Sequence, residues 1–361
     1  MRMVKQAIRF CASSDGVRLA FGMHGSGPPL VRVATWLTHL QYDWDSPLWR
    51  HWLEGLADGR TLLRYDERGS GLSDRDVTRF SLDAWVADLE AVVDAAGLER
   101  FSLLGLSNGG AVAIAYAVRH PARVSHLVLC GAFSQGRLRR DPSSTARSEA
   151  EALLSMIRAG WGRANPAFRR AFTTLFVPDA THEQMEWFDE LQRMSTSAAT
   201  AAQMRLAREE VDVTDLVGQV VTPTLVLHAH DDAAVPFEQG RLVASAIPGA
   251  RFVPLEGRNH ILLADEPAWE VFLRELDAFL PSLPSDDDVA KDLLTARETE
   301  ILRGVAAGMT NQAIARQLFV SVRTVERHMG NMYGKLGLHG KSGRAAIAAR
   351  AASLIRDRPD A

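Results

Sequence analysis

A serine set between glycines is the residue best placed to do chemistry in this chain of 361 residues. Ser107 lies in the sequence GLSNG at Gly105–Gly109, between an apolar run at 101–104 and a helix-like stretch at 111–121. A G-x-S-x-G segment between a strand and a helix forms a sharp turn that exposes the serine hydroxyl, and its glycines avoid clashes beside the strained serine backbone. The helix N-terminus that follows favours negative charge. The pattern predicts a nucleophilic serine, the alternative being a serine in an ordinary glycine-rich turn.

A serine nucleophile needs a base, and the base needs a carboxylate that orients it. In a sheet with this turn the chain order is serine, acid, histidine. His260 follows the apolar run 251–253 and is the candidate base, while Asp232, four residues before Pro236, is the candidate acid, with Asp231 as the alternative. Order and spacing therefore predict a triad of Ser107, Asp232 and His260. Three other histidines are expected to be structural or to line a pocket: His39, His228 and His230.

The elements that must position these residues alternate along the first 280 residues. Short apolar runs predict strands at 30–33, 62–65, 101–104, 124–129, 224–227 and 251–253, separated by helical stretches, which is typical of a mostly parallel, doubly wound α/β sheet. A turn around Ser14–Gly16 predicts an N-terminal hairpin. Between about Arg137 and Val217 the strand signal disappears, and a capping-box pattern at Thr181–Gln184 opens a helix. This stretch is predicted to be a helical lid.

With the serine motif in this setting, the chain resembles the α/β-hydrolase superfamily over roughly residues 8–281. Residues Arg64–Ser73, RYDERGSGLS, are similar to the family's D-x-R-G-x-G-x-S segment. The family carries its acid at the position of Asp232. The resemblance implies an α/β-hydrolase domain at 1–281 with a lid at about 137–217. It implies no cofactor and no metal.

The chain departs from this family after the run 30–33. The family usually has His-Gly there, where this chain has Ala34, Thr35 and Trp36. The resemblance implies that the backbone N–H groups of Asn108 and Trp36 form the oxyanion hole, and a backbone donor survives replacement of its side chain. The segment 36–52 also holds four tryptophans. They are interpreted as core packing, with a pocket wall as the alternative.

The last 70 or so residues have a different character. Residues 290–361 contain 12 Lys and Arg against 6 Asp and Glu, while the other 289 residues contain 29 against 38. A capping box at Thr295–Glu298 opens a first helix, Thr310 caps a second, and Ser321 caps a third. The third helix has an apolar stripe made of Val325, Met329, Met332 and Leu336. Arg323, Arg327 and Gly330 fall on its opposite face. This is the spacing of a helix-turn-helix on a basic module that suits a polyanion.

From Leu294 to about Leu354 the chain resembles the bacterial LuxR-type helix-turn-helix, a four-helix domain predicted at 291–361 after a Pro/Asp-rich linker at 282–290. A fourth helix, from Ser342 to about Leu354, is a candidate dimer surface. The resemblance implies phosphate contacts by Thr324, His328 and Lys335 and base contacts by Glu326, Arg327 and Gly330. The full predicted DNA-binding set is Arg323, Thr324, Val325, Glu326, Arg327, His328, Gly330 and Lys335. The expected partner is double-stranded DNA, bound as a homodimer, and RNA polymerase is a further partner compatible with this class.

The bulk composition agrees with a cytoplasmic protein of two domains. The two cysteines, Cys11 and Cys130, indicate neither a disulfide framework nor a zinc site. The N-terminus does not have the pattern of a signal peptide. The sequence has no run of about 18 apolar residues, so no membrane contact is expected.

Three functions fit this combination. In the first, a transcription regulator uses its hydrolase-like body to sense, and in one version hydrolyse, a small molecule that controls DNA binding. In the second, a working serine hydrolase for esters or lactones uses the DNA domain for localisation or autoregulation. In the third, the body has lost turnover and serves as a protein-interaction platform. The first is preferred.

Overall fold

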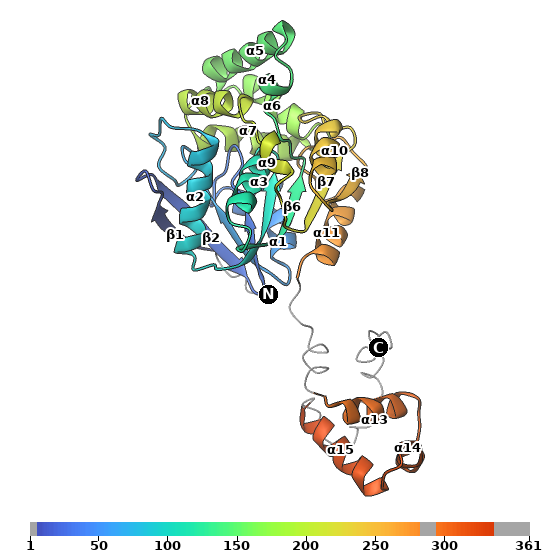
Figure 1. Ribbon diagram of the computed structural model, residues 1–361. Coiled ribbons are helices and arrows are strands. Elements are labelled where there is room, and N and C mark those ends of the chain that lie inside the picture. Colours follow the sequence, from blue (N-terminus) through green and yellow to red (C-terminus); the bar gives the residue numbers. More distant parts are fainter. Residues whose placement is uncertain (1–5, 282–293, 336–361) are drawn as a thin grey trace. The chain divides into compact units, whose positions relative to one another are not determined.

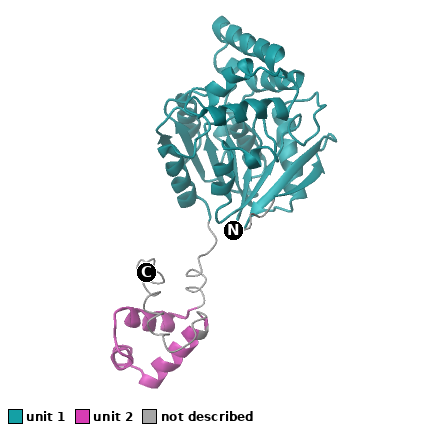
Figure 2. Ribbon diagram, turned by 180° about the vertical axis from the view of Figure 1, so that it is seen from behind, with its two compact units in different colours: residues 1–282 teal, residues 283–361 magenta. Residues whose placement is uncertain are grey.

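A computed structural model describes residues 6–281 and 294–335 of the chain. The chain divides into two compact units, Met1–Ser282 and Leu283–Ala361 (Figure 2). The predicted linker at 282–290 and the predicted fourth helix from Ser342 lie outside the described residues.

The first unit is built on one eight-stranded sheet (Figure 1). Its strands are β1 (Ala7–Ala12), β2 (Arg18–Gly25), β3 (Pro29–Arg32), β4 (Thr61–Tyr65), β5 (Phe101–Leu106), β6 (Val124–Cys130), β7 (Thr224–Ala229) and β8 (Arg251–Leu255). They lie in the order β1-β2-β4-β3-β5-β6-β7-β8. The pairs β1–β2 and β2–β4 are antiparallel, and the pairs from β4 to β8 are parallel. The predicted mostly parallel sheet and the N-terminal hairpin are both confirmed.

Helices cover both faces of this sheet. One face packs against α2 (Leu82–Ala95), α3 (Gly109–Arg119) and α10 (Phe237–Ala246). The other packs against α1 (Arg50–Ala57) and α11 (Pro267–Phe279). Successive strand residues point to opposite faces, so Leu103 joins the first core and Leu104 the second. Burial on both faces explains why these strands are continuous apolar runs.

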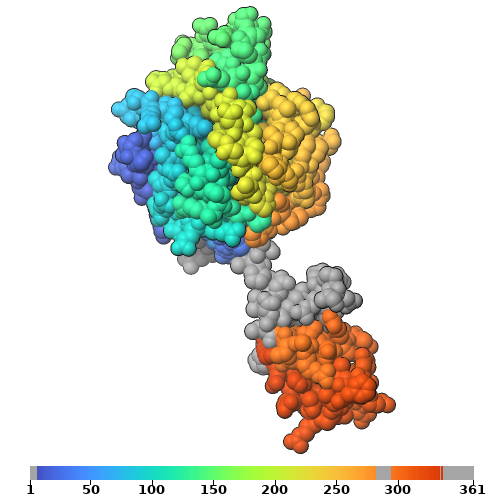
Figure 3. All heavy atoms as spheres, viewed as in Figure 1, coloured from blue at the N-terminus to red at the C-terminus, as the bar shows by residue number. Residues whose placement is uncertain are grey.

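The segment predicted to be a lid consists of helices and the loops between them. Its helices are α4 (Arg137–Arg140), α5 (Ser144–Gly160), α6 (Ala167–Phe176), α7 (His182–Ser195), α8 (Ala198–Glu209) and α9 (Thr214–Val217). The capping box at Thr181 and Gln184 is present. Buried Arg169 donates hydrogen bonds to the carbonyls of Trp161, Arg163 and Asp189, which ties α6 to the end of α5 and to α7. The space-filling view shows the green part of the lid at one end of the unit, while its yellow end continues down the face (Figure 3).

The second unit contains α13 (Ala296–Ala306), α14 (Asn311–Gln317) and α15 (Val322–Lys335). The predicted capping box is formed, because Thr295 Oγ1 accepts the Glu298 N–H while Glu298 Oε2 accepts the Thr295 N–H. Thr310 and Ser321 cap the next two helices as predicted. The core contains Ile301, Leu302, Val305, Ile314, Ala315, Val325, Met329 and Met332.

Among residues 6–281 and 294–335, no helix has the length and apolar character that crossing a bilayer requires.

Candidate functional site

Ser107 lies in the predicted sharp turn between β5 and α3. Its φ is +50°, a left-handed conformation that costs a non-glycine residue about 1–2 kcal/mol. Two backbone hydrogen bonds hold the turn, from the Ser107 N–H to the Cys130 carbonyl (2.9 Å) and from the Gly110 N–H to the Ser107 carbonyl (3.0 Å). A Cβ at Gly105 would lie 2.7 Å from Gly110 Cα, so only glycine allows this approach of strand and helix. Strained backbone of this kind is typical of sites where a side chain is held in a fixed position for a ligand.

The geometry selects Asp232 over Asp231 as the acid. Asp232 Oδ2 accepts a hydrogen bond from His260 Nδ1 at 2.7 Å, whereas Asp231 is exposed and pairs with His230. Asp232 Oδ1 accepts the backbone N–H groups of Ala234 (2.8 Å) and Val235 (2.9 Å). Because Nδ1 of His260 is engaged in this way, Nε2 is the nitrogen left to act as a base.

Electrostatics keep Asp232 ionised. Burial of this carboxyl opposes its charge, but the neighbouring His260 and the hydrogen bonds from His228, His260 and the Val235 N–H outweigh burial and hold the pKa of Asp232 well below its usual range. His228, expected to be structural, is fully buried, with Nε2 3.0 Å from the Val235 carbonyl and 3.4 Å from Asp232 Oδ2. A permanent carboxylate is what an orienting acid requires.

Ser107, Asp232 and His260 line one cavity of about 560 Å³ between the carboxyl ends of the strands and the lid. Among the described residues, Ser107 Oγ makes no hydrogen bond to His260, so the contact between these two side chains stays a prediction. The lid closes over the histidine, because the Phe176 carbonyl accepts the His260 N–H at 2.9 Å and the two rings lie 5.5 Å apart. Catalytic hydrogen bonds are often formed only once a substrate is bound.

Two tryptophans of the segment 36–52 have both of the roles that the sequence left open, and a third has one of them. Trp49 and Trp52 are buried in the core against α11 and also line the cavity, and Trp36 lines it beside the serine turn. The cavity wall is therefore largely aromatic on the side of the sheet, and Phe172 and Phe188 continue it on the lid. Such a wall suits the apolar part of a small organic molecule.

One predicted oxyanion donor contacts the side chain of the residue that carries the other. Asn108 follows the serine at the start of α3, and the Trp36 N–H donates to the Asn108 side-chain carbonyl at 3.3 Å. The Trp36 N–H is therefore already bonded to the Asn108 side chain and is not free for a ligand. Sequence reasoning missed this contact, because the spacing of 72 residues between the two groups carries no local signal.

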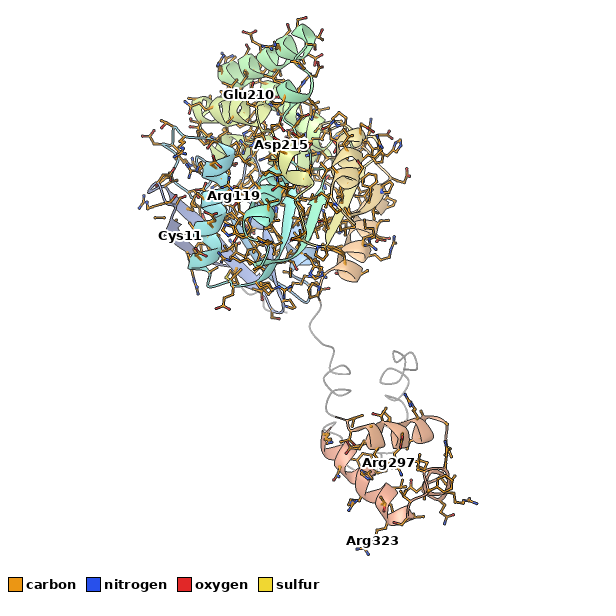
Figure 4. The ribbon with its side chains drawn as sticks, in the orientation of Figure 1. Cys11, Arg119, Glu210, Asp215, Arg297 and Arg323 are labelled. Atoms are coloured by element: carbon orange, nitrogen blue, oxygen red, sulfur yellow. The ribbon has the colours of Figure 1, made fainter. Side chains whose placement is uncertain are left out.

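In the second unit, α15 presents the predicted polar face to solvent. Arg323, Glu326, Arg327 and Gly330 are exposed, and Figure 4 shows Arg323 extending away from the helices. Thr324 and His328 are half-buried.

Two members of the predicted DNA-binding set need comment. Val325 lies on the inward-facing side of α15 and is fully buried in the core of the unit. The prediction that its side chain contacts DNA is therefore wrong. Lys335, predicted to contact phosphate, places Nζ 2.7 Å from Glu298 Oε2, whose side chain is buried. Burial disfavours the Glu298 charge, but the bonds from Lys335 and Thr295 outweigh it and lower the pKa of Glu298. Lys335 thus supports the capping box of α13.

Comparison with known proteins assigns a family to each unit. The family model described as alpha/beta hydrolase fold matches residues 28–267. The chain belongs to this α/β-hydrolase family. A model described as bacterial regulatory proteins of the luxR family matches residues 292–348, so this α/β hydrolase carries a C-terminal LuxR-type DNA-binding domain.

Individual relatives cover the first unit. Pyrrolizixenacetamide deacetylase of Xenorhabdus hominickii is 28% identical over 271 residues, 73% of this chain and 95% of that protein. Non-heme chloroperoxidase of Streptomyces lividans is 28% identical over 284 residues, 75% of this chain and 98% of that protein. Among solved structures, an esterase from Exiguobacterium antarcticum is similar with a TM-score of 0.63 and 25% identity, over 75% of this chain and 98% of that one.

The α/β-hydrolase cavity has one further feature that sequence reasoning missed. Four arginines line it from the lid: Arg137, Arg140, Arg205 and Arg208. The only signal in the sequence was that the lid is rich in arginine, which does not distinguish a solvated surface from a cavity wall.

Proposed function

We propose that the protein is a DNA-binding regulator whose α/β-hydrolase unit binds, and hydrolyses, a small-molecule signal at Ser107. The observation that carries this proposal is one cavity lined by a strained serine and by a histidine bonded to a low-pKa carboxylate. The same chain carries a LuxR-type domain. A regulator without chemistry would not need all three groups in this arrangement.

The residues support an acyl-transfer mechanism. Ser107 Oγ attacks the carbonyl carbon of the signal, and His260 Nε2 takes the hydroxyl proton and returns it to the leaving group. Asp232 stabilises the imidazolium through Nδ1. The Asn108 and Trp36 N–H groups would stabilise the oxyanion once the Asn108 side chain has turned away. Water activated by His260 then releases the acyl group from the serine.

The size and covering of the cavity indicate the class of signal. A volume of about 560 Å³ is in the range of sites for small organic ligands. The names of the relatives, a deacetylase and an esterase, favour an ester or amide linkage. The lid helices cover the triad, and a macromolecular substrate would not fit beneath them. A small ester, lactone or amide is therefore the proposed signal.

For the second unit we propose that α15 enters the major groove. Its exposed face carries Arg323 and Arg327, which can donate hydrogen bonds to base edges or phosphates. Glu326 on the same face can accept a hydrogen bond from the amino group of a cytosine. Helix-turn-helix proteins read two half-sites as dimers, so a homodimer on DNA is expected. Binding should weaken steeply with salt, because phosphate contacts release counterions.

The test compares full-length wild type with Ser107→Ala in two assays. The first is hydrolysis of p-nitrophenyl acetate, which wild type should catalyse and Ser107→Ala should not. The second is genome-wide footprinting in cells, where Ser107→Ala should change the occupancy of the bound operators. Ser107-dependent hydrolysis with unchanged occupancy would favour the alternative, a hydrolase that uses its DNA domain for localisation. Absence of turnover on esters, lactones and amides would overturn the hydrolytic part.

A further inference from the structure

We propose that Arg140 and Arg205 of the lid form an anion subsite in the catalytic cavity, which selects signals that carry a carboxylate in addition to the bond that is cleaved. This inference rests on the proposed function of the same cavity and names its substrate class. The argument uses the charges beneath the lid, their hydrogen bonds and their position relative to Ser107.

The arginine cluster is not fully paired. The cavity is lined by four lid arginines, and three carboxylates lie within ion-pair distance of them. Each of these carboxylates is assigned to a different arginine, the pairs being Arg137 with Glu149, Arg205 with Glu209, and Arg208 with Glu67. One guanidinium, that of Arg140, is left over.

Arg140 is only weakly satisfied by the protein. Its one hydrogen bond among the described residues is a long one, from Nη1 to the Gln135 carbonyl at 3.4 Å, and no described carboxylate lies within ion-pair distance. Burial lowers the pKa of Arg140, partly offset by Glu209. Asp141, the next residue, also lines the cavity and favours the Arg140 charge, but it is exposed, accepts the Ser143 N–H and forms no ion pair with Arg140. A half-buried cation without an ion-pair partner is costly, and a bound anion would reduce that cost.

Arg205 connects this cation to the reaction centre. Its guanidinium lies 5.8 Å from the centre of the Trp36 ring, and the Trp36 N–H bonds to the residue that follows Ser107. Nη2 of Arg205 lies 2.7 Å from Glu209 Oε1, but that oxygen accepts no aligned hydrogen bond and the buried Nε of Arg205 donates none. Arg205 therefore has donors left for a ligand that also reaches the oxyanion hole.

A carboxylate fits these observations better than a more highly charged group. Arg140 has no carboxylate at ion-pair distance among the described residues, and a single ligand carboxylate would supply one. Much of the remaining wall is aromatic or aliphatic, including Trp36, Trp49, Phe172, Phe176 and Leu153. A guanidinium accepts a carboxylate through two parallel hydrogen bonds, each charge-assisted. The expected ligand is an apolar ester or amide with one carboxylate.

The test uses three esters of similar size and the full-length protein, with turnover followed by proton release. Butyl butyrate is neutral, monobutyl glutarate has its carboxylate on the acyl side, and 4-(butanoyloxy)butanoate has it on the alcohol side. A charge-assisted hydrogen bond contributes about 1.5–3 kcal/mol, or about 10- to 150-fold in affinity. Wild type should therefore hydrolyse one of the two acids at least 10-fold better than butyl butyrate, by kcat/KM.

Variants assign the preference to the subsite. Arg140→Gln should lower the ratio of acid to neutral kcat/KM by 10-fold or more, and Arg140→Lys should retain part of it. The matched control is Arg139→Gln in the same helix, because Arg139 is exposed, pairs with Glu210 at 2.9 Å and does not line the cavity. A control that lowers the ratio equally, or wild type that prefers neither acid, would overturn the inference.

Binding without turnover separates this inference from the proposed function. In Ser107→Ala, calorimetric titration should show at least 10-fold tighter binding of the preferred acid than of butyl butyrate. Arg140→Gln in the same background should remove the difference. Ser107-dependent hydrolysis of all three esters at equal rates would refute the subsite and leave the hydrolase intact. Selective binding without hydrolysis would refute the hydrolase and support the subsite.

Discussion

Removal of the Asn108 side chain should speed the enzyme. Asn108 Oδ1 accepts the Trp36 N–H, the second predicted oxyanion donor, at 3.3 Å. This bond must break before the N–H can bind a substrate oxygen. A neutral hydrogen bond contributes about 0.5–1.5 kcal/mol, and 3.3 Å is long for an N–H donor, so the lower half of that range applies. Asn108→Ala should raise kcat/KM about 2- to 5-fold, the equivalent of about 0.5–1 kcal/mol.

The substitution leaves the rest of the site in place. The Asn108 side chain makes no cap hydrogen bond to α3, and its backbone is right-handed helical, which alanine adopts readily. The assay is p-nitrophenyl acetate hydrolysis by full-length protein, with the Ser107→Ala rate subtracted. Asn165→Ala is the control, since Asn165 is exposed and bonds only to the Ala167 N–H. A 10-fold fall in kcat/KM with an unchanged melting temperature would refute the reasoning and assign the Asn108 amide a role in catalysis.

Three further predictions concern charges. Asp232→Asn should lower kcat by about 10⁴-fold while the fold persists, since the amide keeps an oxygen for the Ala234 N–H but cannot orient the imidazole; an effect below 10-fold in ester hydrolysis would speak against the triad. Burial raises the pKa of Asp66 to about 7, so its contribution to stability is full below about pH 4 and is lost as the pH rises to about 7. Between about pH 4 and 7, the Asp66 carboxyl should lower the free energy of unfolding by about 1.4 kcal/mol per pH unit. Chemical denaturation at a series of pH values should show that Asp66→Asn removes this contribution. Lys335→Ala should destabilise the second unit by about 1–2 kcal/mol, because it leaves the buried Glu298 without its cation; a full chain that melts like wild type would contradict this.

Local sterics made the serine turn predictable. Gly105, Ser107 and Gly109 follow a buried strand directly, and a left-handed serine between a strand and a helix depends on residues close in sequence. The strands were equally predictable, since burial on both faces leaves continuous apolar runs. The structure shifts the strand predicted at 30–33 by one residue and lengthens the other predicted strands by one or two residues. The caps at Thr181, Thr295 and Thr310 are local as well.

Selection between neighbouring residues required tertiary structure. Asp231 and Asp232 are alike in sequence, and the loop after β7 turns only Asp232 toward the Ala234 and Val235 N–H groups and His260. Val325 is a different case, because its place on the apolar stripe of the third helix was already visible in the sequence, and its burial agrees with that stripe.

The sequence by itself determined the class of this protein: a serine turn in a parallel sheet, followed by a capped helix-turn-helix, because both depend on contacts within a few residues. Only the tertiary structure decided what the cavity can bind. The pairing of Arg208 with Glu67 spans 141 residues and the contact of Trp36 with Asn108 spans 72. Whether Arg140 has a partner, and whether the oxyanion donor is free, depends on which distant charges and amides the lid brings together, and no local pattern encodes that.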